Sequence, residues 1–165
     1  MQTQSASILV VGIGNLLAAD DGVGVRVAEK LIERNRCMGA CVMDGATDGL
    51  ALLEPVRAAR ELIVIDAMDL GDVPPGTVER LEPREILKAQ SQKLSVHGID
   101  FADMLRIVQA EQGALPHLII FGIQPESVVP YTYGITPRVE AVIDDVVEMV
   151  ETEVHSLVQQ GGKTS

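Results

Sequence analysis

The sequence predicts a three-layer α/β/α sandwich, in which a mostly parallel, five-stranded twisted sheet carries helices on both faces. Short runs of aliphatic and β-branched residues alternate with longer segments whose apolar residues recur at helical spacing. Hydrophobic residues make up 47% of the 165 residues, but only two Phe, two Tyr and no Trp occur, so we expect an aliphatic core. We expect one domain over residues 1–165, with residues 161–165 as a flexible tail.

The first half of the chain contains the expected strands 7–11, 41–43 and 62–65 and the expected helices 22–34 and 47–56. The strands are continuous apolar runs, as in parallel sheets that are buried on both faces. Each strand stops at a turn or acidic residue, namely Gly12, Asp44 or Asp66. Thr47 is placed to cap the second helix.

The second half begins with a turn-rich stretch over residues 69–76, which is followed by an extra strand at 77–81 that we expect to be antiparallel. A helix at 100–111 and a strand at 118–123 come next. Thr136 and Pro137 then favour a helix start, because the hydroxyl can cap and proline suits the first helical position. An apolar stripe predicts one long closing helix that continues to Leu157.

The charge balance excludes several kinds of partner. Asp and Glu number 24 against 13 Lys and Arg, which gives a net charge of -11. We therefore expect no nucleic acid and no membrane partner, since no basic surface is available for phosphates. The first residues do not read as a signal peptide, and Cys37 and Cys41 are too few for a disulfide scaffold. We expect a soluble, cytoplasmic monomer, because no long hydrophobic face is left unassigned.

Acidic residues follow the first and third strands. In open α/β sheets, ligands bind at the carboxyl ends of the strands where strand order reverses. If the order begins 2-1-3, this crevice lies between Asp20-Asp21, after the first strand, and Asp66, at the end of the third. Asp20 and Asp21 can also simply stabilise the N-terminus of a helix, and His97 can be an exposed loop residue. Taken together, two carboxylates and one imidazole suit Ni, Zn or Mn and leave positions open to activate water.

Gly12-Ile-Gly14 follows a strand and precedes a helix, so a dinucleotide site must be considered. Leu17 occupies the place of the third glycine, and the acidic pair Asp20-Asp21 would repel a pyrophosphate. We interpret these glycines as a sharp turn that allows close approach of another chain segment. The sequence contains neither a Gly-x-Ser-x-Gly elbow nor a His-Glu-x-x-His helix.

The segment from Val10 to Val25 closely resembles the opening motif of the nickel-iron (NiFe) hydrogenase maturation endopeptidases. The resemblance continues in order along nearly the whole chain. It covers residues 44–49 (DGATDG), 63–67 (IVIDA), 75–77 (PGT), 95–97 (SVH), 122–127 (GIQPES) and 134–137 (GITP). Each piece is weak alone, but the ordered set is specific.

The resemblance implies an endopeptidase that removes the C-terminal extension from the nickel-loaded precursor of a hydrogenase large subunit. It implies that Asp21, Asp66 and His97 engage the nickel, so that loading is checked before cleavage. Nickel would then come with the substrate, and Zn or another divalent ion could replace it in the isolated protein. An alternative is a non-catalytic chaperone that senses nickel through the same three ligands; another is a nucleotide-binding α/β domain.

Further residues are candidates for substrate contact or catalysis. Asp44 is our candidate general base, although Asp44-Gly45 can equally be a plain turn. Tyr131 and Tyr133 suit protein recognition, or they pack on the last helix. The remaining candidates for substrate binding are Gly14, Asn15, Gln124 and Glu126.

Overall fold

The computed structural model describes residues 8–46, 51–82 and 101–162, which build one five-stranded sheet. Its strands are β1 (Ile8–Ile13), β2 (Ala40–Ala46), β3 (Glu61–Ala67), β4 (Val78–Leu81) and β5 (His117–Ile123). The strand order is β2-β1-β3-β5-β4. All neighbouring strands are parallel except β4, which runs antiparallel to β5. The predicted mostly parallel sheet and its antiparallel extra strand are confirmed.

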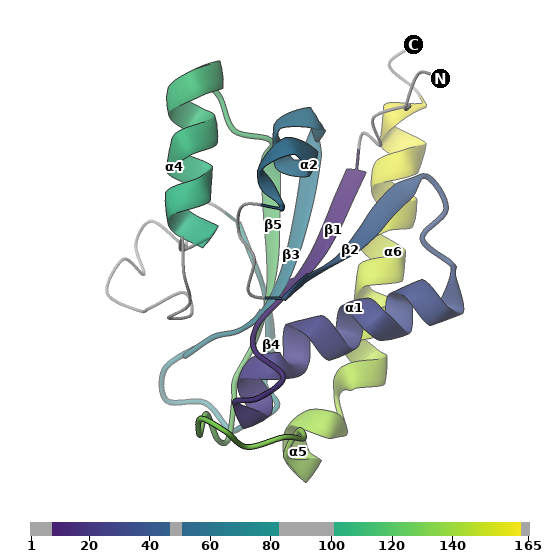
Figure 1. Ribbon diagram of the computed structural model, residues 1–165. Helices are drawn as coiled ribbons and strands as arrows, with labels where there is room; N and C mark the ends of the chain where they lie inside the picture. Colours follow the sequence, from purple (N-terminus) through teal and green to yellow (C-terminus); the bar gives the residue numbers. More distant parts are fainter. Residues whose placement is uncertain (1–7, 47–50, 83–100, 163–165) are drawn as a thin grey trace.

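Helices cover both faces of the sheet, as the three-layer prediction requires (Figure 1). The α1 and α6 helices pack against each other on one face, and α2 and α4 do so on the other. The helical elements are η1 (Ala19–Gly22), α1 (Val23–Arg34), α2 (Leu53–Ala58), α4 (Phe101–Gln112), α5 (Pro137–Glu140) and α6 (Ile143–Gly161). None of the helices in the described ranges has the length and apolar character needed to cross a bilayer.

Alternation along β3 divides the interior into two cores. Ile63 and Ile65 pack with α1 and α6, whereas Leu62 and Val64 pack with α2 and α4. Successive strand side chains point to opposite faces, so a fully buried strand needs apolar residues at every position. Asp66, which is also buried, is the exception within β3.

The bounds of the second strand and the second helix differ from the prediction. The β2 strand continues to Ala46, so Asp44 lies inside the strand and pairs with Gly12 of β1. The ladder with β1 extends β2 past the residue that we expected to end it. The short α2 helix begins only at Leu53, and Thr47, its predicted cap, lies outside the described residues.

The prediction of a single closing helix is wrong, because a tight turn separates α5 from α6. The backbone N–H of Val142 donates to the carbonyl of Val139, three residues earlier, at 3.2 Å. Val139 and Ile143 are nevertheless both buried, so the apolar stripe survives the break. Thr136 precedes the helix as predicted, but its hydroxyl does not cap it.

Candidate active site

Two glycines, one in β1 and one in α1, let α1 begin directly over the carboxyl ends of two strands. A Cβ atom on Gly24 would lie 2.2 Å from the carbonyl oxygen of Ile65 and 2.3 Å from that of Ile13. A Cβ atom on Gly12 would lie 2.0 Å from the carbonyl oxygen of Gly24. All three distances are shorter than real Cβ contacts, so only glycine fits at these two positions. The glycine pattern thus provides close helix–strand packing.

Asp21 lies in η1, immediately before α1, and its side chain is only 6% exposed. Its Oδ2 accepts a hydrogen bond of 3.1 Å from the backbone N–H of Asn15. Gly14 supports this turn with a φ of 137°, and a Cβ there would lie 1.8 Å from the carbonyl oxygen of Asp21. Because η1 also contacts β3, Asp21 is held at the edge where β1 and β3 end.

Asp66 reaches the same edge from β3. It is the second-last residue of the strand, pairs with Gly122 of β5 and is 1% exposed. A carboxylate buried this deeply requires hydrogen-bond donors or a cation around it. The strand order begins β2-β1-β3, which is the condition under which we expected a crevice between the first and third strands. The structure therefore brings the Asp21 and Asp66 segments to one edge.

His97, the third predicted ligand, lies outside the described residues. Within the described ranges, no group of three His, Cys, Asp or Glu side chains converges to hold a metal ion. Two buried carboxylates supply hard oxygen donors that fit a divalent cation, but they make only part of a site. The metal function of this edge stays a prediction.

Asp44 is exposed, and the structure does not bring it beside Asp66. In β2 it alternates with Met43, which belongs to the α2 and α4 core, whereas Asp66 lies in β3 on the same side as Val64 of that core. Asp44 is thus directed to the opposite face by alternation. Two strand spacings, roughly 10 Å, separate the β2 and β3 backbones at this level. Asp44 is therefore accessible to solvent at the edge but apart from the two buried acids.

The residue that our sequence reasoning missed is Asp20, which is 0% exposed. Its Oδ2 accepts hydrogen bonds from the backbone N–H groups of Glu126 and Ser127 at 2.9 and 3.0 Å. Thr136 donates to both carboxylate oxygens of Asp20, from its backbone N–H to Oδ1 at 2.7 Å and from its Oγ1 to Oδ2 at 2.8 Å. The Thr136 hydroxyl, which we expected to cap the last helix, therefore binds Asp20 instead. A pair of adjacent acids was visible in the sequence, but nothing local shows which of the two faces inward.

Among the predicted substrate-contact residues, Gln124 and Glu126 contact other parts of the chain, whereas the two tyrosines are exposed. The Oε1 atom of Gln124 accepts from the backbone N–H of Leu70 at 2.7 Å, so this side chain orders the loop after β3. The carboxylate of Glu126 lies 3.5 Å from the guanidinium of Arg138. Tyr131 and Tyr133 are 97% and 73% exposed, so the interpretation that they pack on the last helix is wrong.

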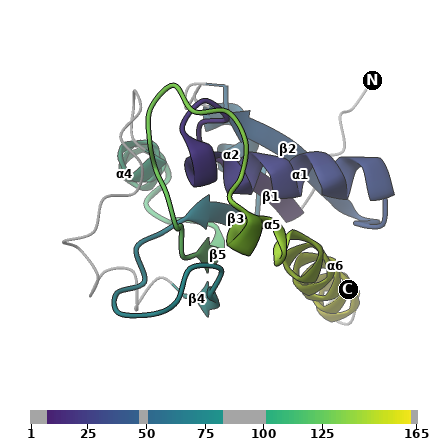
Figure 2. The same cartoon turned by 90° about the horizontal axis from the view of Figure 1, so that it is seen from below.

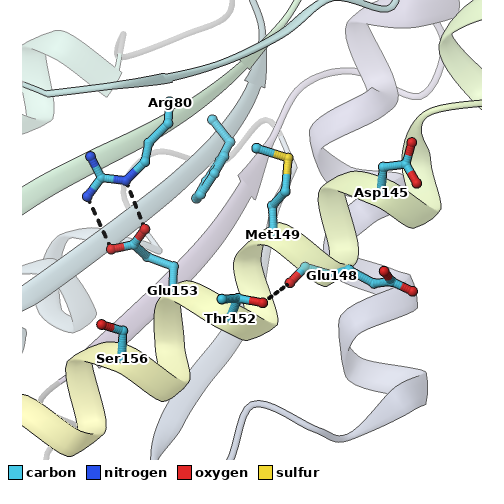
Figure 3. A pocket seen from close by; sticks show the side chains of 8 residues that line it. Arg80, Asp145, Glu148, Met149, Thr152, Glu153 and Ser156 are labelled. Carbon is cyan, nitrogen blue, oxygen red and sulfur yellow. Dashed lines mark hydrogen bonds and ion pairs between the residues drawn. The ribbon is translucent and has the colours of Figure 1, made fainter.

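A cavity of about 570 Å³ lies between β4, β5 and α6, away from the two buried acids (Figure 3). Arg80 projects over it and is held by Glu153 of α6 through bonds of 2.8 and 3.1 Å. The hydrogen bonds that the Arg80 guanidinium donates to Glu153 and Glu82 raise its pKa further above the ordinary value. The cavity is open to solvent, and the Arg80 guanidinium is already paired with Glu153. We therefore interpret this surface as a structural contact between β4 and α6.

The two cysteines are free thiols. Cys37 is buried and Cys41 is exposed. Burial, with a smaller contribution from the Glu151 carboxylate, raises the pKa of the Cys37 thiol. A raised pKa lowers the thiolate fraction, so Cys37 is a poor nucleophile and a poor metal ligand.

Fold and site together define a class: a three-layer α/β protein with buried aspartates at the carboxyl edge of its sheet, where the strand order reverses. Residues 25–153 match the family model described as hydrogenase maturation protease, and the chain belongs to that family. It is 35% identical over 144 residues to the hydrogenase 2 maturation protease of Escherichia coli (strain K12), with 87% of both chains covered. The hydrogenase expression/formation protein HupD of Thiocapsa roseopersicina is 40% identical over 146 residues.

That second match covers 86% of this chain but 65% of the relative, so the chain spans just under two thirds of its length. Among solved structures, the hydrogenase maturating endopeptidase HybD from E. coli superposes with a TM-score of 0.77 and 33% identity. The superposition covers 90% of this chain and 92% of that one. The predicted family and fold are therefore confirmed.

Proposed function

We propose that the protein is the endopeptidase that removes the C-terminal extension from the nickel-loaded precursor of a NiFe-hydrogenase large subunit. The observation that carries the proposal is the convergence of two buried carboxylate-bearing segments at the β1–β3 edge of a chain from this family. A cytoplasmic reaction agrees with the two free cysteines.

Asp21, Asp66 and His97 are proposed to recognise the nickel that the substrate brings. A bound divalent cation polarises a carbonyl and lowers the pKa of water. The buried positions of Asp21 and Asp66 favour a strong interaction with a cation, because electrostatic attraction is less screened there than at an exposed surface. A protease whose metal comes only with its loaded substrate spares the empty precursor.

Other residues at the edge would hold the substrate chain. Gly14 and Asn15 line the turn that supports Asp21, and Gln124 and Glu126 begin the loop that follows β5. Tyr131 and Tyr133 offer exposed aromatic surface of the kind that is enriched in protein interfaces. Asp44 remains our candidate general base, and its exposure allows contact with water and substrate.

The first experiment incubates the protein with nickel-loaded and nickel-free precursor and measures product mass. We expect cleavage of the loaded precursor only, and loss of cleavage in Asp21→Ala, Asp66→Ala and His97→Ala. Asp144→Ala is the matched control, because that acid is exposed on α6 and forms an ion pair with Lys30 at the surface.

Each alternative outcome has a separate meaning. Binding that depends on nickel without any cut would favour the chaperone function. Equal cleavage of loaded and empty precursor would contradict nickel recognition. No interaction with either precursor would reject the proposed client.

A further inference from the structure

Asp20 joins the turn after β1 to the loop after β5. Its carboxylate accepts four hydrogen bonds from Glu126, Ser127 and Thr136, at distances of 2.7 to 3.0 Å. Its own backbone N–H donates to the carbonyl of Ser127 at 3.0 Å. A carboxylate only accepts hydrogen bonds, so it can satisfy all four of these donors at once.

Backbone pairing strengthens the same junction. The N–H of Ala19 donates to the carbonyl of Thr132 at 2.7 Å, and the N–H of Thr132 donates to the carbonyl of Leu17 at 3.0 Å. Figure 2 shows the long loop between β5 and α5 arching beside the turn that precedes α1. Because Asp21 is the next residue after Asp20, the loop and the predicted nickel acid are fixed to one short turn.

The loop presents an uncharged, apolar surface. No charged residue occurs between Glu126 and Arg138, in a chain whose net charge is -11. Five large hydrophobic side chains are exposed here, one in the turn after β1 and four in the loop after β5. They are Leu17, Val128, Val129, Tyr131 and Tyr133. We call these five residues the docking surface.

Backbone strain marks the same place. Tyr131 has a φ of 60° and Ala19 has a φ of 51°, in the left-handed region that side chains rarely adopt. Such conformations persist only where the surrounding structure enforces them, and they cluster at functional sites. Here the hydrogen bonds of Asp20 and Thr132 enforce them while Tyr131 points into solvent.

We propose that Asp20 is a positioning residue, which holds the docking surface in register with Asp21 so that an uncharged segment of the precursor can bind beside the scissile bond. This inference rests on the proposed endopeptidase function. A chain with a net charge of -11 repels an acidic segment, whereas an apolar segment can bind the uncharged docking surface without burying an unpaired charge. Asp20 itself, being fully buried, does not touch substrate.

The test measures kcat and KM for cleavage of nickel-loaded precursor. In Asp20→Asn one acceptor oxygen becomes an NH2 donor that faces backbone and hydroxyl donors, so the loop loosens. We expect KM to rise about tenfold, the factor that corresponds to about 1.4 kcal/mol, while kcat at saturation is unchanged. Thr136→Val removes one of the four bonds and should raise KM less, and it serves as the readout if Asp20→Asn does not fold.

Thr152→Val is the matched control for Thr136→Val. Thr152 lies on α6 and its hydroxyl donates only to the carbonyl of Glu148 at 2.8 Å. We expect its KM and kcat to equal those of the wild type. If Thr152→Val raised KM as much as Thr136→Val does, the effect would reflect general destabilisation and the proposal would be overturned.

A double-mutant cycle connects Asp20 with the docking surface. If Asp20 acts by positioning it, adding Asp20→Asn to a Tyr131→Ser/Tyr133→Ser variant should raise KM far less than it does in the wild type. Fully additive effects, or a fall in kcat with unchanged KM, would overturn the positioning role. Failure of the endopeptidase proposal is distinguishable, because the wild-type protein would then not cleave the loaded precursor at all.

Discussion

At the residue scale, the adjacent residues Asp20 and Asp21 have different roles. Asp20 is surrounded by four donors from the loop after β5, whereas Asp21 accepts from Asn15 within its own turn. Both are buried, so burial alone does not separate a structural carboxylate from a candidate ligand. The partners of Asp20 argue against its being a ligand, because a carboxylate that accepts four protein hydrogen bonds has little capacity left for a cation.

Asp44→Asn tests the candidate general base. If Asp44 accepts a proton during peptide hydrolysis, kcat should fall about a hundredfold or more with little change in KM, since an amide cannot act as a base at neutral pH. The measurement is the steady-state cleavage of nickel-loaded precursor, with Asp103→Asn on α4 as an exposed control. A wild-type kcat in Asp44→Asn would assign the base to another group and leave Asp44 as a β2 surface residue.

At the element scale, the position of α1 depends on glycine contacts with β1 and β3. The N-terminal turn of α1 lies close enough to two strand carbonyls that no side chain fits at Gly24. This packing puts η1, and hence Asp21, at the carboxyl edge of the sheet. The position of Asp21 therefore depends on the contact of α1 with β1 and β3.

Gly24→Ala should destabilise the fold by about 1–3 kcal/mol or more, because the new methyl group must displace the backbone of β1 and β3. The expected readout is a lower midpoint of urea unfolding with an unchanged m-value. Gly161→Ala is the matched control: it also replaces a helical glycine, but nothing lies within 4 Å of the added Cβ. Stability equal to the wild type in Gly24→Ala would contradict the close approach.

At the scale of the whole molecule, excess negative charge opposes compactness. The net charge is -11 and the pI is about 4.6, so carboxylates repel one another at neutral pH. The ion pairs that lie at the surface, such as Lys30–Asp144 and Arg26–Glu29, contribute about 0–1 kcal/mol each. Added salt therefore weakens the repulsion between carboxylates more than it weakens the attraction within the surface ion pairs.

Raising NaCl from about 0.01 M to 0.15 M should raise the Tm at pH 7, since the Debye length falls from about 30 to about 8 Å. A gain of about 1 kcal/mol would correspond to roughly 2–4 °C for a chain of this size. Differential scanning calorimetry in the presence of a chelator measures it without metal effects. A Tm that falls with salt would mean that the surface ion pairs outweigh the net repulsion.

The amino-acid sequence was sufficient to predict the fold class, the order of strands and helices along the chain, and the edge at which Asp21 and Asp66 lie. These properties depend on local periodicity and on the rule that parallel strands share a carboxyl edge, so short windows of sequence suffice. The buried stripe of Val146, Val150 and Val154 was predicted in the same way.

Three features depend on long-range packing: which acid of the pair holds the loop, toward which face Asp44 is directed, and the exposure of Tyr131 to solvent. The bonds of Asp20 join residues 106 to 116 positions apart. Such contacts arise when the loop after β5 returns to the turn after β1, and no local pattern encodes that return. The hydroxyl of Thr136 bonds Asp20 instead of capping its helix because a buried carboxylate must be satisfied, whereas an exposed helix end can bond to water.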